Sequence, residues 1–187
     1  MDVPIDVSQA VFRTERLILR APKPDDLTAC FAYASVPGVG EMAGWKHHES
    51  LAESEAYLQR IIENKQVFAI ACQESGKLIG TLGFRPSWAN EEKIYAKYKV
   101  KEIGFSLSKV YWGRGLMTEA VRGVIDYAFG TLDLEALTCC HYLQNDRSRR
   151  VIEKCGFQFV KQSTHTSVQL QITQKDRKYI RIRETRV

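Results

Sequence analysis

The segment Tyr111-Trp-Gly-Arg-Gly-Leu-Met-Thr-Glu-Ala120 connects an alternating, strand-like stretch to a long amphipathic one. Gly113 and Gly115 carry no Cβ, so the backbone can turn tightly there and approach a ligand closely. The unpaired N–H groups of the next helical turn, together with the helix dipole, favour an anion such as pyrophosphate. Arg114 adds a positive charge. The segment therefore predicts a glycine turn, a helix and an anion site at their junction.

Two common phosphate-binding patterns do not fit this segment. The P-loop pattern G-x-x-x-x-G-K-[ST] is absent, and the dinucleotide pattern G-x-G-x-x-G fails at its third glycine, where Thr118 stands. The preceding strand also comes after predicted hairpins, whereas a dinucleotide-binding unit opens with its strand. A helix start whose glycines serve only turn geometry is the alternative at this point.

Hydrophobic periodicity outward from this segment predicts an α/β (α+β) fold. Strands are expected at residues 16–20, 67–74, 78–84, 102–107, 136–142 and 157–162, and helices at 24–36, 50–64, 113–130 and 145–155. Residues 168–172 and 180–182 also alternate and are expected to form a closing antiparallel hairpin. With this closing hairpin counted as one unit, the order is β-α-α-β-β-β-α-β-α-β-β, which indicates a mixed, mostly antiparallel central sheet. Residues 1–11 are predicted to be a leading arm and residues 12–187 a single domain.

The composition agrees with one ordinary globular domain. Of the 187 residues, 44% are hydrophobic and 26% are charged, which excludes disordered and fibrous classes. The net charge of +5 is compatible with an anionic ligand but does not by itself indicate nucleic acid. The five cysteines form no C-x-x-C pattern, and the longest apolar run is too short to span a bilayer. The first residues contain neither the basic nor the apolar region of a signal peptide, so none is expected. A cytoplasmic protein with reduced thiols is expected.

A second motif about thirty residues on gives the first one a context. It reads Asn145-Asp-Arg-Ser148-Arg-Arg-Val-Ile-Glu153-Lys154-Cys-Gly156-Phe157. With Glu102-Ile103-Gly104 and the 112–120 segment, it resembles the GNAT superfamily of acetyl-CoA-dependent N-acetyltransferases, and more closely its RimJ/RimL-type branch, which acetylates N-termini of ribosomal proteins. The opening Thr14-Glu-Arg-Leu-Ile-Leu-Arg20 is similar to the same branch. The resemblance covers about residues 12–185 and implies a GNAT-like sheet with helices on both faces.

The resemblance implies acetyl-CoA as co-substrate, with its pyrophosphate held by backbone N–H groups of the glycine loop. It also implies that strand 102–108 splays from strand 136–142, so that the pantetheine arm pairs with backbone and Leu107 offers its N–H to the thioester oxygen. Such an oxyanion donor is worth roughly 3 kcal/mol. The expected contacts to acetyl-CoA are Leu107, Tyr111, Trp112, Gly113, Arg114, Gly115, Leu116, Met117 and Asn145. The family's usual Gln or Arg at the first loop position is replaced by Val110.

Glu102 is the candidate general base. On a strand it shares a face with Gly104 and Ser106, while the opposite face is apolar, so its carboxylate can line a cleft. The alternative is a surface carboxylate at the start of a strand.

Ser148 is the candidate acid that protonates the leaving thiolate, and Asn145 is the expected pantetheine contact. Each has a structural alternative, because Ser in a first helical turn often bonds its own backbone and Asn is a common N-cap.

The acceptor side is expected in the loop between the first two helices, where Trp45 and His47 are the candidate contacts. Adjacent His47 and His48 have poor metal geometry without further ligands, so no metal is expected.

The sequence thus leads to a functional hypothesis. An amine attacks the acetyl group directly in a ternary complex. An α-amine with a pKa near 8 is about 10% neutral at pH 7, and a lysine near 10.4 is below about 0.1%, so a protein N-terminus is the favoured acceptor, with ribosomal proteins as candidates. Polyamine or aminoglycoside acceptors, and a non-catalytic CoA- or ribosome-binding module, are the alternatives. No direct nucleic-acid or membrane partner is expected, and a monomer or a homodimer fits equally.

Overall fold

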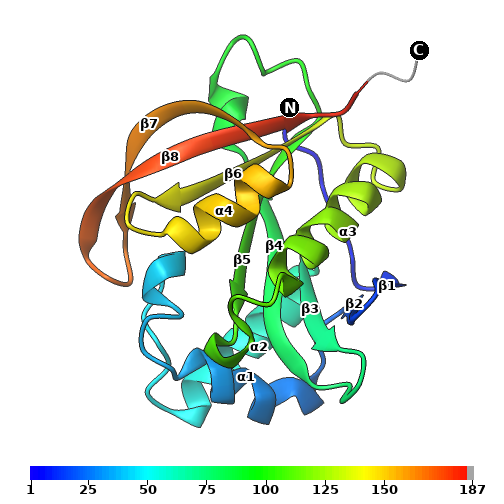
Figure 1. Cartoon of the computed structure of the whole chain (residues 1–187), viewed down its shortest axis with the longest axis vertical. Coiled ribbons are helices and arrows are strands. Elements are labelled where there is room, and N and C mark those ends of the chain that lie inside the picture. The colour runs from blue at the N-terminus through cyan, green and yellow to red at the C-terminus, as the bar shows by residue number, and fades with distance from the viewer. Residues whose placement is uncertain (185–187) are drawn as a thin grey trace.

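A single mixed sheet organises the molecule (Figure 1). The computed structural model describes residues 1–184. The strands are β1 (Val11–Arg13), β2 (Leu17–Arg20), β3 (Val67–Cys72), β4 (Leu78–Pro86), β5 (Val100–Leu107), β6 (Ala136–Tyr142), β7 (Gln158–Ser167) and β8 (Ile172–Ile182). The helices are α1 (Leu27–Ala34), α2 (Leu51–Asn64), α3 (Leu116–Gly130) and α4 (Asp146–Lys154). The predicted α/β class with a mostly antiparallel sheet is confirmed, with β1 as an additional short strand.

The sheet has the order β1-β2-β3-β4-β5-β6-β8-β7, and its one parallel pair among the described residues is β5 with β6. These two strands are in register only from Val100 opposite Ala136 to Glu102 opposite Thr138. Beyond those residues β5 continues to Leu107 and β6 to Tyr142 without pairing to each other. The predicted splay of the two strands is therefore present, and it leaves a gap in the middle of the sheet.

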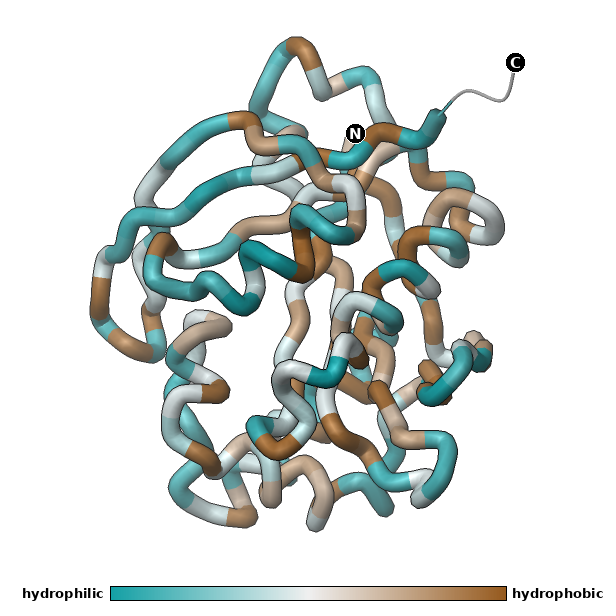
Figure 2. Tube along the Cα trace, viewed as in Figure 1, coloured by the Kyte–Doolittle hydropathy of each residue, from teal (hydrophilic) through white to brown (hydrophobic). Residues whose placement is uncertain are grey.

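Helices cover both faces of the sheet because β3 is apolar on both sides. Phe68 and Ile70 pack in the main core with α3, whereas Ala69 packs with Cys30 and Tyr33 of α1. Successive strand residues point to opposite faces, so α1 and α3 lie on opposite faces. Figure 2 shows hydrophobic residues gathered on the central strands and α3, and a largely hydrophilic β7–β8 hairpin.

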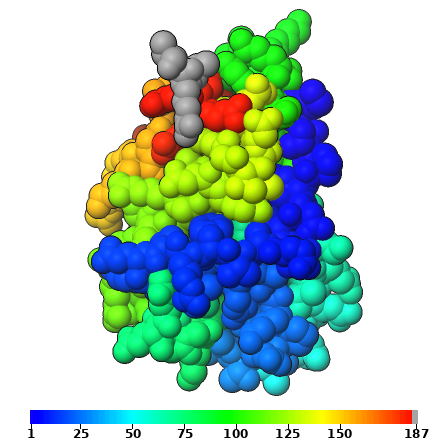
Figure 3. Space-filling model, turned by 90° about the vertical axis from the view of Figure 1, so that its right-hand side faces the viewer, coloured from blue at the N-terminus to red at the C-terminus, as the bar shows by residue number. Residues whose placement is uncertain are grey.

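The N-terminal segment predicted as a leading arm runs along the body of the molecule (Figure 3). Ile5 and Val7 are buried in the main core, and the Val7 N–H donates to the Lys65 carbonyl at 2.8 Å. The arm therefore contributes side chains to the core of the domain that it precedes. Residues 185–187, at the other end of the predicted domain, lie outside the described residues.

The closing hairpin differs from the prediction. Strand β7 continues to Ser167 and pairs with β8 from Ile172 onward, so residues 168–171 form the turn rather than a strand. Val168 is 88% exposed, and Gln171 has a φ of +52°, which suits a turn. The apolar–polar alternation of residues 168–172 was misleading because no sheet face is present there to bury the apolar members.

Candidate functional site

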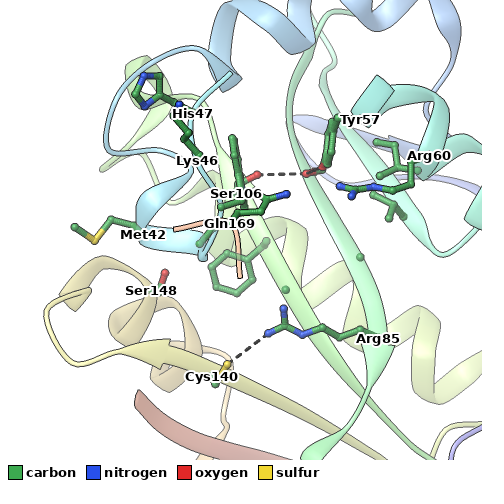
Figure 4. Close-up of a pocket in the computed structure, with 18 of the residues that line it drawn as sticks. Met42, Lys46, His47, Tyr57, Arg60, Arg85, Ser106, Cys140, Ser148 and Gln169 are labelled. Atoms are coloured by element: carbon green, nitrogen blue, oxygen red, sulfur yellow. Dashed lines mark hydrogen bonds between the residues drawn. The ribbon is translucent and has the colours of Figure 1, made fainter. Parts of the chain in front are cut away.

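Two cavities meet where β5 and β6 separate. The smaller one, of about 420 Å³, lies between the end of β5, the loop before α3, and α4. The larger one, of about 1040 Å³, lies between α2, the 42–48 loop and the cleft faces of β4, β5 and β6 (Figure 4). Both are lined by Met42, Ala43, Phe105, Ser106 and Ser148. Molecules bound in the two cavities would therefore contact the same five residues.

The glycine loop adopts the geometry that its sequence predicts. Gly113 and Gly115 both have φ of +77°, in the left-handed region that favours glycine, and Gly115 is the N-cap residue of α3. The indole N–H of Trp112 donates to the Leu107 carbonyl at 2.8 Å, which ties the loop to the end of β5. All the residues expected to contact acetyl-CoA line the smaller cavity except Arg114.

Leu107 turns its N–H toward the gap. The Ser108 N–H donates to the Ile79 carbonyl on β4 at 2.7 Å, and Leu107 lies opposite Gly80. Along an antiparallel strand, successive N–H groups point to alternate sides. The Leu107 N–H therefore points away from β4, toward the side on which β6 has splayed off, as an oxyanion donor there requires.

Positive charge reaches the smaller cavity from α4 rather than from the glycine loop. Arg147 lies over the Trp112 ring at 4.6 Å, and Arg147, Arg150 and Lys154 line the cavity. The Arg114 guanidinium instead lies over the Tyr111 ring at 5.5 Å. A loop of positive-φ glycines, a helix N-terminus and several cations fit a phosphate-bearing ligand. Helical periodicity could have indicated these cations, because Arg147, Arg150 and Lys154 are spaced i, i+3 and i+7 and therefore share one face of α4.

Asn145 and Ser148 form the N-cap of α4. The Asn145 Oδ1 accepts from the Ser148 N–H at 3.1 Å, and its Nδ2 donates to the Met42 carbonyl at 3.0 Å. Asn145 thus joins α4 to the loop at the junction of the cavities. The cap uses the N–H of Ser148, so the Ser148 hydroxyl is available where both cavities meet.

Glu102 lies beside the larger cavity, paired with a cation. Its side chain is 8% exposed, and its Oε1 accepts from Nε and Nη2 of Arg85 on β4 at 2.8 and 2.5 Å. The thiol of Cys140 on β6 lies 3.5 Å from both side chains. Burial opposes the charge of Arg85, but the Glu102 carboxylate outweighs it and raises the pKa of Arg85, so Arg85 stays protonated. Arg85, half exposed, lines the cavity in front of Glu102.

The candidate acceptor contacts line the larger cavity. Trp45 stacks on Tyr57 with ring centroids 6.3 Å apart, and His47 pairs through Nδ1 with Glu41 at 2.6 Å. Their loop is held at Gly44, whose carbonyl accepts from the Ser167 hydroxyl at 2.8 Å. The cavity wall thus joins segments that lie far apart in the sequence.

A chain of hydroxyl groups in the larger cavity was not predicted. The Tyr57 hydroxyl lies 3.2 Å from that of Thr81, which lies 3.3 Å from that of Ser106. Strand alternation did put Ser106 on the Glu102 face, but only the fold shows that α2 and β4 bring hydroxyls to it.

No three or more His, Cys, Asp or Glu side chains within residues 1–184 are grouped so as to hold a metal ion. None of the helices in that part of the chain has both the length and the apolar content to cross a membrane.

Comparison with known proteins places these features in a family context. Residues 16–158 match the family model described as Acetyltransferase (GNAT) domain. "Uncharacterized N-acetyltransferase YoaA" of Bacillus subtilis strain 168 is 28% identical over 153 residues, covering 79% of this chain and 82% of that protein.

Solved structures share the fold at low sequence identity. An acetyltransferase (GNAT family) from Bacillus anthracis superposes with a TM-score of 0.79 at 18% identity, covering 92% of this chain and 98% of that one. The ribosomal-protein-S5-alanine acetyltransferase from Vibrio fischeri superposes with a TM-score of 0.72 at 19% identity, covering 92% and 96%. At these identities the likeness concerns the fold alone.

Proposed function

Because the chain belongs to the GNAT acetyltransferase family, we propose that it transfers the acetyl group of acetyl-CoA to the α-amine of a protein N-terminus. The observation that carries this proposal is the junction of the two cavities at Met42, Ala43, Phe105, Ser106 and Ser148. With one substrate in each cavity, the amine and the acetyl group meet directly, so no covalent enzyme intermediate is needed. The free cysteines are in keeping with a cytoplasmic location.

In this proposal the smaller cavity holds acetyl-CoA, which when bound supplies a thioester-activated acetyl group. The N–H groups of the loop around Gly113 and Gly115 would hold the pyrophosphate, with Arg147 adding charge. The Leu107 N–H would donate to the oxygen that gains negative charge during transfer. These groups are already oriented by the strand ladder and the glycine loop.

Two side chains would act as general base and general acid. Glu102 would accept a proton from the amine through a water molecule, and Arg85 would hold its carboxylate in place. The Ser148 hydroxyl, at the junction of the cavities, would donate to the departing thiolate. Both assignments rest on the family pattern and on the positions of these groups.

Two arguments support an N-terminal acceptor. An α-amine is far more often neutral at pH 7 than a lysine side chain, so one carboxylate acting through water is a sufficient base. A cavity of about 1040 Å³ is also wide enough for several residues of a peptide. The V. fischeri neighbour, named for a ribosomal-protein alanine, agrees with this acceptor class.

The first test is a screen for acceptors. Acetyl-CoA is incubated with the protein and with N-terminal peptides, polyamines or aminoglycosides, and thiol release is followed. We expect turnover with peptides that carry a free α-amine and not with the same peptides after N-terminal blocking. Turnover only with polyamines or aminoglycosides would show that the acceptor is a small amine and not a protein N-terminus. A shift in melting temperature with CoA but no turnover would indicate a non-catalytic module.

The second test concerns the catalytic assignments. Glu102→Gln and Ser148→Ala are each expected to lower kcat by about 100-fold or more, with the dissociation constant of CoA little changed. Glu153→Gln, an exposed carboxylate on α4, serves as the control. Wild-type kcat in both variants would show that other groups carry the protons.

A further inference from the structure

On its side away from the smaller cavity, the glycine loop lies next to the turn between β1 and β2. Gly115 lines the smaller cavity and also a third, surface cavity whose wall contains residues 12–16 and the first turn of α3. A Cβ at Gly115 would lie 3.7 Å from Nη2 of Arg16. The turn between β1 and β2 therefore backs the loop that faces the smaller cavity.

Glu119, in the first turn of α3, holds the turn between β1 and β2 in place. Its Oε1 accepts from the Thr14 hydroxyl at 2.6 Å and from the Arg16 N–H at 2.7 Å, and its Oε2 accepts from Arg16 Nε at 2.7 Å. Burial opposes ionisation of Glu119, but the bonds from Thr14 and Arg16 outweigh it and lower the pKa. The carboxylate is thus ionised and fixes the orientation of the Arg16 guanidinium.

The remaining arm of that guanidinium reaches the glycine loop. Nη1 of Arg16 donates to the Arg114 carbonyl at 3.1 Å. In a trans peptide unit the carbonyl and the following N–H point in opposite directions. By holding the Arg114 carbonyl on the outer side, Arg16 directs the Gly115 N–H inward, to the smaller cavity that Gly115 lines.

This peptide unit needs such a restraint. It joins Arg114 to Gly115, whose φ is +77°, and glycine populates positive and negative φ about equally. A rotated unit would present the Arg114 carbonyl oxygen to the cavity, and that oxygen would repel a phosphate. The bond from Arg16 favours the orientation that binds an anion.

We propose that Arg16, held by Glu119, is a positioning residue that presets the glycine loop for the pyrophosphate of acetyl-CoA. The proposal rests on the proposed function. It predicts that Arg16 contributes to affinity only for ligands that carry the pyrophosphate.

The test compares two arginines at opposite ends of α3. Arg183 resembles Arg16 in its contacts, since its Nη1 donates to the Phe129 carbonyl at 3.0 Å and to Asp133 at 2.8 Å, but it is remote from the glycine loop. The dissociation constants of CoA and of pantetheine, which lacks phosphate, are measured by calorimetry and by ligand-observed NMR for the wild type, Arg16→Gln and Arg183→Gln. A ¹⁵N-labelled sample reports the Gly115 amide.

We expect Arg16→Gln to weaken CoA binding about tenfold, the scale of a lost charged hydrogen bond, and to leave pantetheine binding unchanged. The Gly115 amide signal should broaden in this variant. Arg183→Gln should stay within about twofold of the wild type for both ligands. If Arg16→Gln does not fold, Arg16→Lys replaces it, since lysine keeps the charge but lacks the planar fork that bonds Glu119 and the Arg114 carbonyl together.

Three results would overturn the inference while leaving the proposed function intact. These are unchanged CoA affinity in the Arg16 variant, an equal loss of CoA and pantetheine binding, or an equal loss in the Arg183 variant. If the wild-type protein does not bind CoA, the proposed function fails and the inference fails with it.

Discussion

At the scale of single residues, His141 shows how burial sets a charge state. Its Nδ1 lies 2.7 Å from the Tyr142 carbonyl and its Nε2 lies 3.2 Å from the Tyr179 hydroxyl. Burial, helped by the charges of Arg177 and Arg149, lowers the pKa of His141 from its usual 6.5. The neutral ring is therefore the form that fits the fold.

A pH dependence of stability follows. In the unfolded chain His141 binds a proton below about pH 6.5, and in the folded protein only at lower pH. Its contribution is thus complete above pH 6.5 and is lost as the pH falls through that value toward the folded pKa. We expect the free energy of unfolding in urea to fall between pH 7.5 and 5, and His141→Gln to make this fall smaller.

The exposed His165 provides the control. His165→Gln should keep the wild-type difference between the two pH values. If His141→Gln keeps the same difference, another group is responsible for the acid sensitivity.

At the scale of elements, two glycines near the ends of α3 have different roles. Gly113, before the helix, has a φ of +77°, and an added Cβ would meet no atom within 4 Å. Any cost of Gly113→Ala therefore comes from the left-handed backbone, which disfavours alanine by about 1 kcal/mol. We expect this loss in urea unfolding, together with weaker CoA binding.

Gly130, at the end of the same helix, is the matched control, because it has equal space and no positive φ. Gly130→Ala should leave stability unchanged or raise it by up to about 1 kcal/mol, since alanine favours helix. Equal losses in the two variants would contradict the assigned role of the left-handed φ.

At the scale of the whole molecule, the N-terminal segment belongs to the core. Val7 has no exposed surface, whereas Val11, four residues on, is 67% exposed. Val7→Ala removes two buried methyl groups and should lower the free energy of unfolding by about 2 kcal/mol. Val11→Ala should stay within about 0.5 kcal/mol of the wild type. Similar unfolding midpoints for both variants would show that the arm is not part of the cooperative unit.

The sequence predicted elements well where one periodicity runs over many residues. The helices expected at residues 113–130 and 50–64 are both present, as α3 and as α2, whose start is capped by the Ser50 hydroxyl accepting from the Glu53 N–H. Prediction failed at residues 168–172, because the alternating apolar and polar residues there have no sheet face on which the apolar ones could be buried. The sequence also did not reveal the burial of Ile5 and Val7, because isolated apolar residues in an irregular segment show no hydrophobic periodicity.

By itself, the sequence determined the order of the elements and the glycine loop, because helix caps, apolar periodicity and positive-φ glycines act over a few neighbouring residues. Only the tertiary structure decided which partners complete the site. Arg85 meets Glu102 across β4 and β5, Arg147 covers Trp112 from α4, and Arg16 reaches the Arg114 carbonyl from a turn about a hundred residues earlier. These contacts depend on strand register and helix packing, which no local pattern encodes.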